Sequence, residues 1–264
     1  MSLGLTVDGK RVHATTGGRP FDPARPVTIF IHGAGFDHTV WKLQARYFAW
    51  HGGSVLALDL PGHGQSEGPP LDSVPALAEW VVSVMDAVGV AQAALVGHSM
   101  GSLVALEAAA RYPERVRALA LLGCAVPLKV ADVLLDSSAA NDHLAFDLIN
   151  SWGYGRRAQF GGHRVPGLWM MRGGLRTLER AAPGVLNADL RACNDYAGGD
   201  EAAAKLRCPT LFVIGERDMM TPPRLGLALA KKIESAQVVT LPGIGHIMME
   251  EAPDATLDAL RRIL

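Results

Sequence analysis

Cysteine, net charge and long apolar runs are all scarce in this chain of 264 residues. The cysteines number only three, stand far apart and form no Cys-x-x-Cys pair, which excludes a disulfide framework and a cysteine zinc site. Lysine and arginine (25) nearly balance aspartate and glutamate (26), so the basic excess of a nucleic-acid-binding protein is missing. No uncharged apolar stretch reaches the roughly 18 residues that a membrane span requires.

Apolar residues, by contrast, are plentiful: hydrophobic residues make up 49% of the chain and charged residues 19%, enough for a large core and too apolar for global disorder. The first residues, MSLGLTVDGKRVH, lack the basic start and apolar run of a signal peptide. Together with the unpaired cysteines, this predicts a reducing, cytoplasmic setting. We expect a small-molecule substrate, with neither a nucleic-acid partner nor a membrane span, and the composition predicts no oligomeric state.

Short apolar runs predict strands, and the segments between them carry apolar residues at helical spacing. The predicted strands are Leu3–Val7, Arg11–Ala14, Val27–Ile31, Ser54–Leu58, Ala93–Val96, Val116–Leu122, Thr210–Ile214 and Gln237–Leu241. The predicted helices are Thr39–Trp50, Leu77–Val88, Met100–Tyr112, Arg224–Ile233 and Pro253–Leu264. Wholly apolar strands that alternate with helices indicate an α/β fold: a mostly parallel sheet with helices on both faces and a ligand site at the carboxyl ends of the strands. The opening pair, joined at Asp8-Gly9, predicts an antiparallel hairpin at one edge.

One interval breaks this alternation. From Pro127 to Lys205 the chain runs about 80 residues between consecutive strands, where a crossover needs only about 10 to 30. This length predicts a helical cap insertion over the strand ends, with residues 1–126 and 206–264 forming the core. The first part of the insertion is acidic, and the second is rich in arginine, glycine and aromatic residues.

The sequence Gly97-His98-Ser99-Met100-Gly101 fits Gly-x-Ser-x-Gly and lies between a predicted strand and a predicted helix. Such a turn exposes the serine hydroxyl, and it needs glycine two residues away on either side because side chains there would collide. The arrangement predicts that Ser99 is a nucleophile. The alternative is an ordinary strand-to-helix turn.

A serine nucleophile needs a base, and the base needs an acid that orients it. His246 follows the last predicted strand and is the predicted base, with His63 as a weaker competitor and His32 as structural support. Asp218 follows the preceding strand and is the predicted acid, while Glu216, two residues nearer that strand, is the alternative. Glu250 and Glu251 are interpreted as helix-start or surface carboxylates.

Two backbone amides are the expected oxyanion donors. Met100 N–H lies at the start of a helix, and Ala34 N–H lies in the glycine-rich loop His32-Gly33-Ala34-Gly35 after an earlier strand. A glycine-rich turn without a catalytic part is the alternative for that loop.

Five motifs in order carry a family resemblance: HGAGFDHTVW, DLPGHGQS, GHSMG, GERD and GIGHIMMEEAP. Together they resemble the α/β-hydrolase family, particularly cap-bearing serine hydrolases of the monoacylglycerol-lipase and carboxylesterase types. The resemblance implies a catalytic triad of Ser99, Asp218 and His246, with oxyanion donors at Ala34 and Met100. It argues against epoxide hydrolases and haloalkane dehalogenases, which carry aspartate in place of the serine.

We therefore expect a carboxylic ester hydrolase that acts on a small apolar substrate through an acyl-enzyme. Lactone, thioester or carbon–carbon (β-diketone-type) hydrolysis and a non-catalytic ligand receptor are the alternatives. No cofactor and no metal site are expected. The residues expected to contact the substrate are Gly35, Phe36, Trp152 and Trp169. Two questions stay open: whether the cap aromatics line a pocket or only pack, and whether the cap arginines meet an anionic ligand or pair with cap aspartates.

Overall fold

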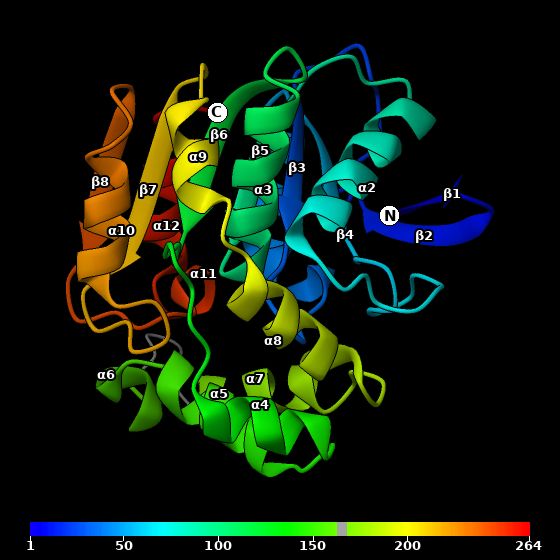
Figure 1. Ribbon diagram of the computed structural model, residues 1–264. Helices are drawn as coiled ribbons and strands as arrows, with labels where there is room; N and C mark the ends of the chain where they lie inside the picture. The colour runs from blue at the N-terminus through cyan, green and yellow to red at the C-terminus, as the bar shows by residue number, and fades with distance from the viewer. Residues whose placement is uncertain (163–167) are drawn as a thin grey trace.

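A mostly parallel sheet of eight strands forms the centre of the computed structural model, which describes residues 1–162 and 168–264 (Figure 1). The strand order is β1-β2-β4-β3-β5-β6-β7-β8. Only the pairings β1 with β2 and β2 with β4 are antiparallel; the others are parallel. The strands are β1 Ser2–Val7, β2 Lys10–Thr15, β3 Val27–Ile31, β4 Ser54–Leu58, β5 Ala93–His98, β6 Val116–Leu122, β7 Thr210–Gly215 and β8 Ala236–Leu241. The α/β fold and the edge hairpin are confirmed.

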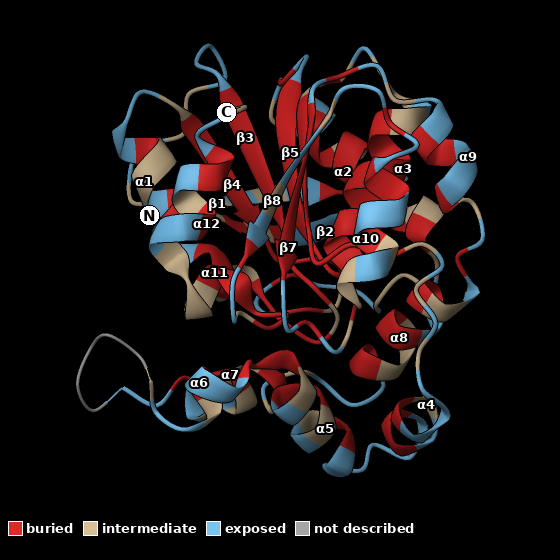
Figure 2. Ribbon diagram, turned by 90° about the vertical axis from the view of Figure 1, so that its left-hand side faces the viewer, coloured by how far each residue is buried: buried red, intermediate tan, exposed pale blue. Residues whose placement is uncertain are grey.

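Helices cover both faces of the sheet, and Figure 2 shows the buried strands between the two layers. One layer holds α1 Lys42–Trp50, α11 Met248–Glu251 and α12 Pro253–Leu260; the other holds α2 Val74–Ala87, α3 Met100–Arg111, α9 Gly199–Ala204 and α10 Pro223–Ala230. Successive side chains of a strand point to opposite faces. Ile29 and Ile31 therefore pack with Leu77 of α2, whereas Phe30 packs with Trp41 on the other face.

The helix predicted over Thr39–Trp50 is divided in the structure. A 3₁₀ turn, His38–Trp41, precedes α1, and the Asp37 carboxylate caps it by accepting the Thr39 N–H at 2.9 Å. Helix α12 ends at Leu260 rather than at Leu264. No helix in the described ranges has the length and apolar composition needed to cross a bilayer.

The described residues of the long interval between β6 and β7 form six helices. Five of them lie beyond the carboxyl ends of the strands, at the bottom of Figure 1: α4 Asp132–Ala139, α5 Leu144–Gly153, α6 Arg156–Gln159, α7 Met170–Leu178 and α8 Val185–Asp195. The sixth, α9, packs beside α3 on the sheet, with Ala202 and Ala203 buried in the core there. We keep the name cap for residues 127–205, although its last helix rests on the core.

Candidate active site

Ser99 lies on the turn between β5 and α3, where its backbone has φ 52° and ψ −118°. Positive φ is strained for a residue with a side chain, so the surroundings must hold this conformation. The flanking glycines are required by close contact: a Cβ on Gly97 would come 2.1 Å from the Gly101 oxygen, and one on Gly101 would come 2.4 Å from the Ile31 oxygen. The turn therefore has the geometry that the motif predicts, with Ser99 immediately before α3.

His246 and Asp218 meet at the ends of neighbouring strands. Asp218 follows β7 and His246 follows β8, and 2.8 Å separates His246 Nδ1 from Asp218 Oδ2. Thr221 completes the support of the carboxylate: its hydroxyl donates to Asp218 Oδ2 at 2.6 Å, and its N–H donates to Oδ1 at 2.7 Å. Glu216, the alternative acid, accepts the Gly243 N–H at 2.8 Å instead. The structure thus brings Asp218, and not Glu216, to His246.

His98 holds the other side of the His246 loop. The ring of His98 is fully buried, and its Nε2 donates to the His246 carbonyl oxygen at 2.9 Å. Burial, assisted by the nearby His246, lowers the pKa of His98 well below its usual value, so this ring is neutral. The sequence did not indicate this contact, because the two residues are 148 positions apart.

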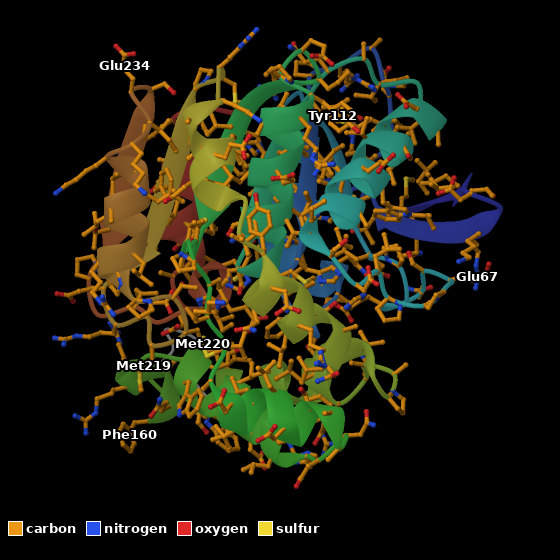
Figure 3. The ribbon with its side chains drawn as sticks, in the orientation of Figure 1. Glu67, Tyr112, Phe160, Met219, Met220 and Glu234 are labelled. Atoms are coloured by element: carbon orange, nitrogen blue, oxygen red, sulfur yellow. The ribbon has the colours of Figure 1, made fainter. Side chains whose placement is uncertain are left out.

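Ser99, His98 and His246 line one cavity of about 120 Å³ together with Gly33 and Ala34 of the loop after β3. The remaining walls are mostly apolar and come largely from the cap: Phe36, Leu128, Val130, Ala131, Leu134, Ile149, Trp152, Leu190, Cys193, Met219 and Met220. Met219 and Met220 lie between the end of β7 and the cap helices (Figure 3). Lys129 also lines the cavity, and its ammonium group donates to the backbone carbonyl oxygen of Asn194 at 2.9 Å.

Comparison with known proteins identifies the family. The sequence pattern of the Alpha/beta hydrolase family matches residues 28–259. This chain is an α/β hydrolase. The family resemblance carried by the five motifs is confirmed.

Several known hydrolases are similar to this α/β hydrolase. It is 24% identical over 240 residues to the (E)-2-((N-methylformamido)methylene)succinate hydrolase of Acinetobacter baylyi, with 88% of each chain covered. A solved structure of a thermophilic esterase is similar at 29% identity and a TM-score of 0.81, covering 99% of this chain and 96% of the other. The enol-lactonase of Burkholderia xenovorans LB400 has the same fold, with a TM-score of 0.88, 22% identity and 99% of each chain covered.

Two of the four expected substrate contacts line the cavity of this α/β hydrolase. Phe36 and Trp152 are in its wall. Trp169 is not in the wall, because it stands at the start of α7 with 54% of its surface exposed. Gly35 is also absent from the wall, since its backbone faces the cap, where an added Cβ would lie 3.0 Å from Leu186.

The remaining histidine candidates have structural contacts. His32 is fully buried, and its Nε2 accepts the Leu60 N–H at 3.1 Å. His63, the weaker competitor for the base, lies 2.8 Å from a carboxylate oxygen of Asp189 in the cap. Neither interaction involves Ser99, and the supporting role expected for His32 fits its contact.

Glu250 and Glu251 lie in the first turn of α11, as expected of helix-start carboxylates, but the alternative of plain surface carboxylates is wrong because both are partly buried and hydrogen-bonded. Glu250 accepts the Tyr154 hydroxyl at 2.6 Å, and Glu251 accepts the N–H groups of Gly155 at 2.9 Å and Gly245 at 3.1 Å. Burial raises the pKa of Glu251 to about 7, although the backbone donors oppose that shift. Both carboxylates thus fasten the end of α5 to the loop that carries His246.

The cap arginines divide between local and long-range partners. Arg176 pairs with Glu179 at 2.5 Å, and Arg180 reaches Asp37 of the core at 2.6 Å. One of the cap aspartates, Asp147, pairs with His143 at 3.0 Å. Arg164 lies outside the described residues.

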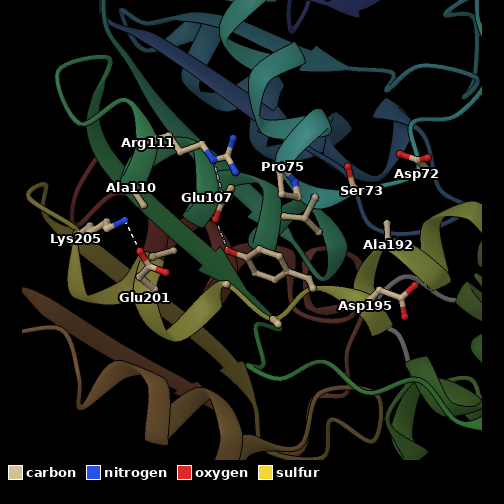
Figure 4. A pocket seen from close by; sticks show the side chains of 15 residues that line it. Asp72, Ser73, Pro75, Glu107, Ala110, Arg111, Ala192, Asp195, Glu201 and Lys205 are labelled. Atoms are coloured by element: carbon tan, nitrogen blue, oxygen red, sulfur yellow. Dashed lines mark hydrogen bonds and ion pairs between the residues drawn. The ribbon is translucent and has the colours of Figure 1, made fainter.

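A second, more polar cavity of about 600 Å³ lies between α2, α3 and α9 (Figure 4). Its charged groups include two pairs, Arg111 with Glu107 and Lys205 with Glu201. Tyr196 also donates its hydroxyl to Glu107 at 2.5 Å. In the described part of the chain, this second cavity and the cavity of Ser99 have no lining residue in common.

Within the described part of the chain, His13, His38 and Asp59 are near enough to hold a metal ion, with their ligand atoms within 4.8 Å of one another. These groups already have partners, because Asp59 Oδ1 accepts both the N–H and the Nδ1–H of His38, at 2.8 and 2.7 Å. Asp59 Oδ2 accepts the Gln65 N–H at 2.9 Å. Hydrogen bonds thus account for the arrangement without an ion.

Proposed function

We propose that this α/β hydrolase is a serine esterase that cleaves small, uncharged carboxylic esters through an acyl-enzyme. The observation that carries the proposal is the meeting of Ser99 and His246 in one apolar cavity, with Asp218 bound to the far nitrogen of the histidine. A nucleophile, a base and an orienting acid are the parts that acyl transfer requires. The 29% identity to a solved esterase supports the same reaction class.

In the proposed reaction, His246 Nε2 takes the proton of the Ser99 hydroxyl while the serine oxygen attacks the ester carbonyl carbon. The carbonyl electron pair moves onto its oxygen, where the N–H groups of Ala34 and Met100 stabilise the negative charge. The pair returns, the alkoxide leaves, and His246 gives it the proton. A water molecule then repeats the sequence on the acyl-enzyme, which releases the acid and restores Ser99.

The cavity supports a preference for short acyl groups. Its volume of about 120 Å³ is close to that of an apolar cavity of ~150 Å³ that holds benzene. The mostly apolar walls offer an acid or phosphate group little compensation for its lost hydration, and the ammonium group of Lys129 in the wall already donates to the backbone oxygen of Asn194. We therefore expect acetyl and butyryl esters to be better substrates than octanoyl or carboxylate-bearing ones.

The test compares Ser99→Ala with the wild-type protein on p-nitrophenyl acetate and butyrate. The serine variant should fold normally and lose nearly all turnover, and only the wild type should gain the mass of a fluorophosphonate label. The control is Ser83→Ala on α2, where the hydroxyl donates to the Glu79 oxygen within the same helix. Wild-type rates in the Ser99 variant would end the assignment. Labelling without turnover of esters, lactones, thioesters or β-diketones would indicate a receptor instead.

A further inference from the structure

The loop that carries Ala34 is a tight turn. Phe36 N–H donates to the Gly33 oxygen at 3.2 Å, which closes four residues into a turn. Gly35, the third residue, has φ 69°, the conformation that a type II turn requires there. Types I and II differ mainly in the orientation of the peptide between the second and third residues. The Gly35 N–H belongs to that peptide, so the partner of this N–H decides which of the two turns forms. The Ala34 N–H belongs to the preceding peptide of the same turn, so it is positioned wherever the turn as a whole is held.

A cap carboxylate holds that peptide. Asp189 of α8 accepts the Gly35 N–H on its Oδ2 at 2.8 Å, across 154 positions of sequence. Only 1% of the Asp189 surface is exposed. A hydrogen bond in which an ionised carboxylate accepts from a backbone N–H is stronger than one between two neutral groups.

The same carboxylate oxygen is paired with His63 of the loop after β4. His63 Nε2 lies 2.8 Å from Asp189 Oδ2, and Nδ1 lies 3.0 Å from the Pro61 oxygen. A carboxylate and a carbonyl can only accept, so both ring nitrogens carry a proton and the ring is an imidazolium. The charge of Asp189 is thus balanced and fixed in place by a second loop of the core.

The cap also packs directly on the turn. A Cβ on Gly35 would lie 3.0 Å from Leu186 Cδ1 and 3.2 Å from Leu178 Cδ2. Leu190, one residue after Asp189, lines the cavity of Ser99. Helix α8 therefore touches the turn and the substrate cavity at once.

We propose that Asp189, held by His63, is a positioning residue that anchors the Gly33–Phe36 turn to the cap through the Gly35 N–H and thereby holds the Ala34 N–H of the same turn in place for the oxyanion. The cap then has two roles: it covers the oxyanion site, and through Asp189 it also holds the turn that supplies one of the donors. The inference rests on the proposed esterase function, because it needs an oxyanion to stabilise. It predicts that losing Asp189 weakens binding of the transition state more than binding of the substrate.

The experiment measures kcat and KM on p-nitrophenyl butyrate and the inhibition constant of butylboronic acid, whose tetrahedral serine adduct occupies the oxyanion site. For Asp189→Ala we expect kcat about 10²-fold lower, a boronate inhibition constant raised by a similar factor, and KM changed far less. Asp189→Asn keeps an oxygen that can accept from Gly35 and should recover most of the loss. The matched control, Asp195→Ala, removes an exposed carboxylate from the same helix and should resemble the wild type.

A second variant keeps the test informative if Asp189→Ala fails to fold. Replacing both partners, His63→Leu with Asp189→Leu, removes the ion pair without leaving a buried charge, an exchange that proteins often tolerate. This double variant should fold and show the same paired loss of kcat and boronate affinity. Wild-type kcat and boronate affinity in a folded Asp189→Ala or double variant would overturn the inference. Full activity in Ser99→Ala would instead overturn the esterase proposal.

Discussion

At the scale of single residues, the acid of the proposed triad is fixed by its neighbours before any substrate binds. Asp218 Oδ1 accepts the N–H groups of Met220 and Thr221, and Oδ2 accepts the Thr221 hydroxyl and faces His246. A carboxylate with four partners has one orientation, so the tautomer of His246 is fixed as well.

Asp218→Asn should therefore lower kcat on p-nitrophenyl butyrate by as much as ~10⁴ while the protein stays folded, because an amide can favour the wrong tautomer. The control is Glu216→Gln, which changes the neighbouring acid that accepts the Gly243 N–H. It should leave kcat within about two-fold of the wild type, since its contact lies outside the triad. Equal losses in both variants, in steady-state kinetics, would refute the choice of Asp218.

The three residues of the proposed triad could be selected from the sequence because each stands in a short motif next to a strand end. Their supporting contacts were not, because they join distant parts of the chain: His98 to His246 across 148 positions and Asp189 to Gly35 across 154. A single sequence contains no periodicity or spacing that reports such pairs. Thr221 is the exception, since aspartate side chains typically accept N–H groups two or three residues further along the chain, as Asp218 accepts the Thr221 N–H.

At the scale of elements, the strands were predicted closely because buried parallel strands are apolar along their whole length, as β3 and β4 are. The cap was predicted only as an insertion. Its helices are short, and their ends depend on contacts with the core, such as Gly155 with Glu251. The boundary between core and cap at residue 127 stays a prediction. Helix α9 belongs to the cap by its position in the sequence, yet it packs beside α3 on the core.

Helix α4 offers a direct test of the cavity wall. Leu134 is 2% exposed and lines the cavity of Ser99. Leu134→Ala should enlarge that cavity and shift the best p-nitrophenyl ester from butyrate toward hexanoate or octanoate. It should also lower the free energy of unfolding by about 2–5 kcal/mol, the usual cost of truncating a buried leucine.

The matched control is Leu144→Ala on α5, where 43% of the leucine surface is exposed. Urea unfolding and a chain-length series should show little change for this variant, because little apolar area is lost there. If Leu134→Ala keeps the butyrate preference despite normal folding, the acyl group does not bind against α4.

At the scale of the whole molecule, two of the attachments between cap and core in the described ranges lie beside residues of the proposed chemistry. Asp189 of the cap accepts the Gly35 N–H of the turn after β3. On the other side, Glu251 of the core accepts the N–H of Gly155 in the cap, and the Gly153 oxygen of the cap accepts the His246 N–H at 2.7 Å. Both attachments reach residues assigned to the proposed chemistry. Weakening these contacts should thus lower kcat as well as change substrate entry, whereas a cap that only covered the cavity would affect substrate entry alone.

Buried histidines should dominate the loss of stability in mild acid. Burial, assisted by the charge of His63, lowers the pKa of His32 to about 4. An unfolded histidine titrates near 6.5, so below that pH the unfolded chain binds more protons and stability falls as pH falls. Glu251 and His63, whose pKa values are raised, contribute with the opposite sign. Wild type and variant must therefore be compared at each pH.

His32→Gln keeps an acceptor for the Leu60 N–H, which now binds His32 Nε2 at 3.1 Å, and removes the titration. Between pH 6.5 and about 4, we expect the wild type to lose about 1.4 kcal/mol more per pH unit than this variant. Urea unfolding at intervals across that range measures the difference, with His51→Gln at an exposed site as the control. Parallel curves for wild type and His32→Gln would mean that the buried ring takes up its proton as readily as an unfolded one, despite the imidazolium of His63 only 4.8 Å away between ring centres.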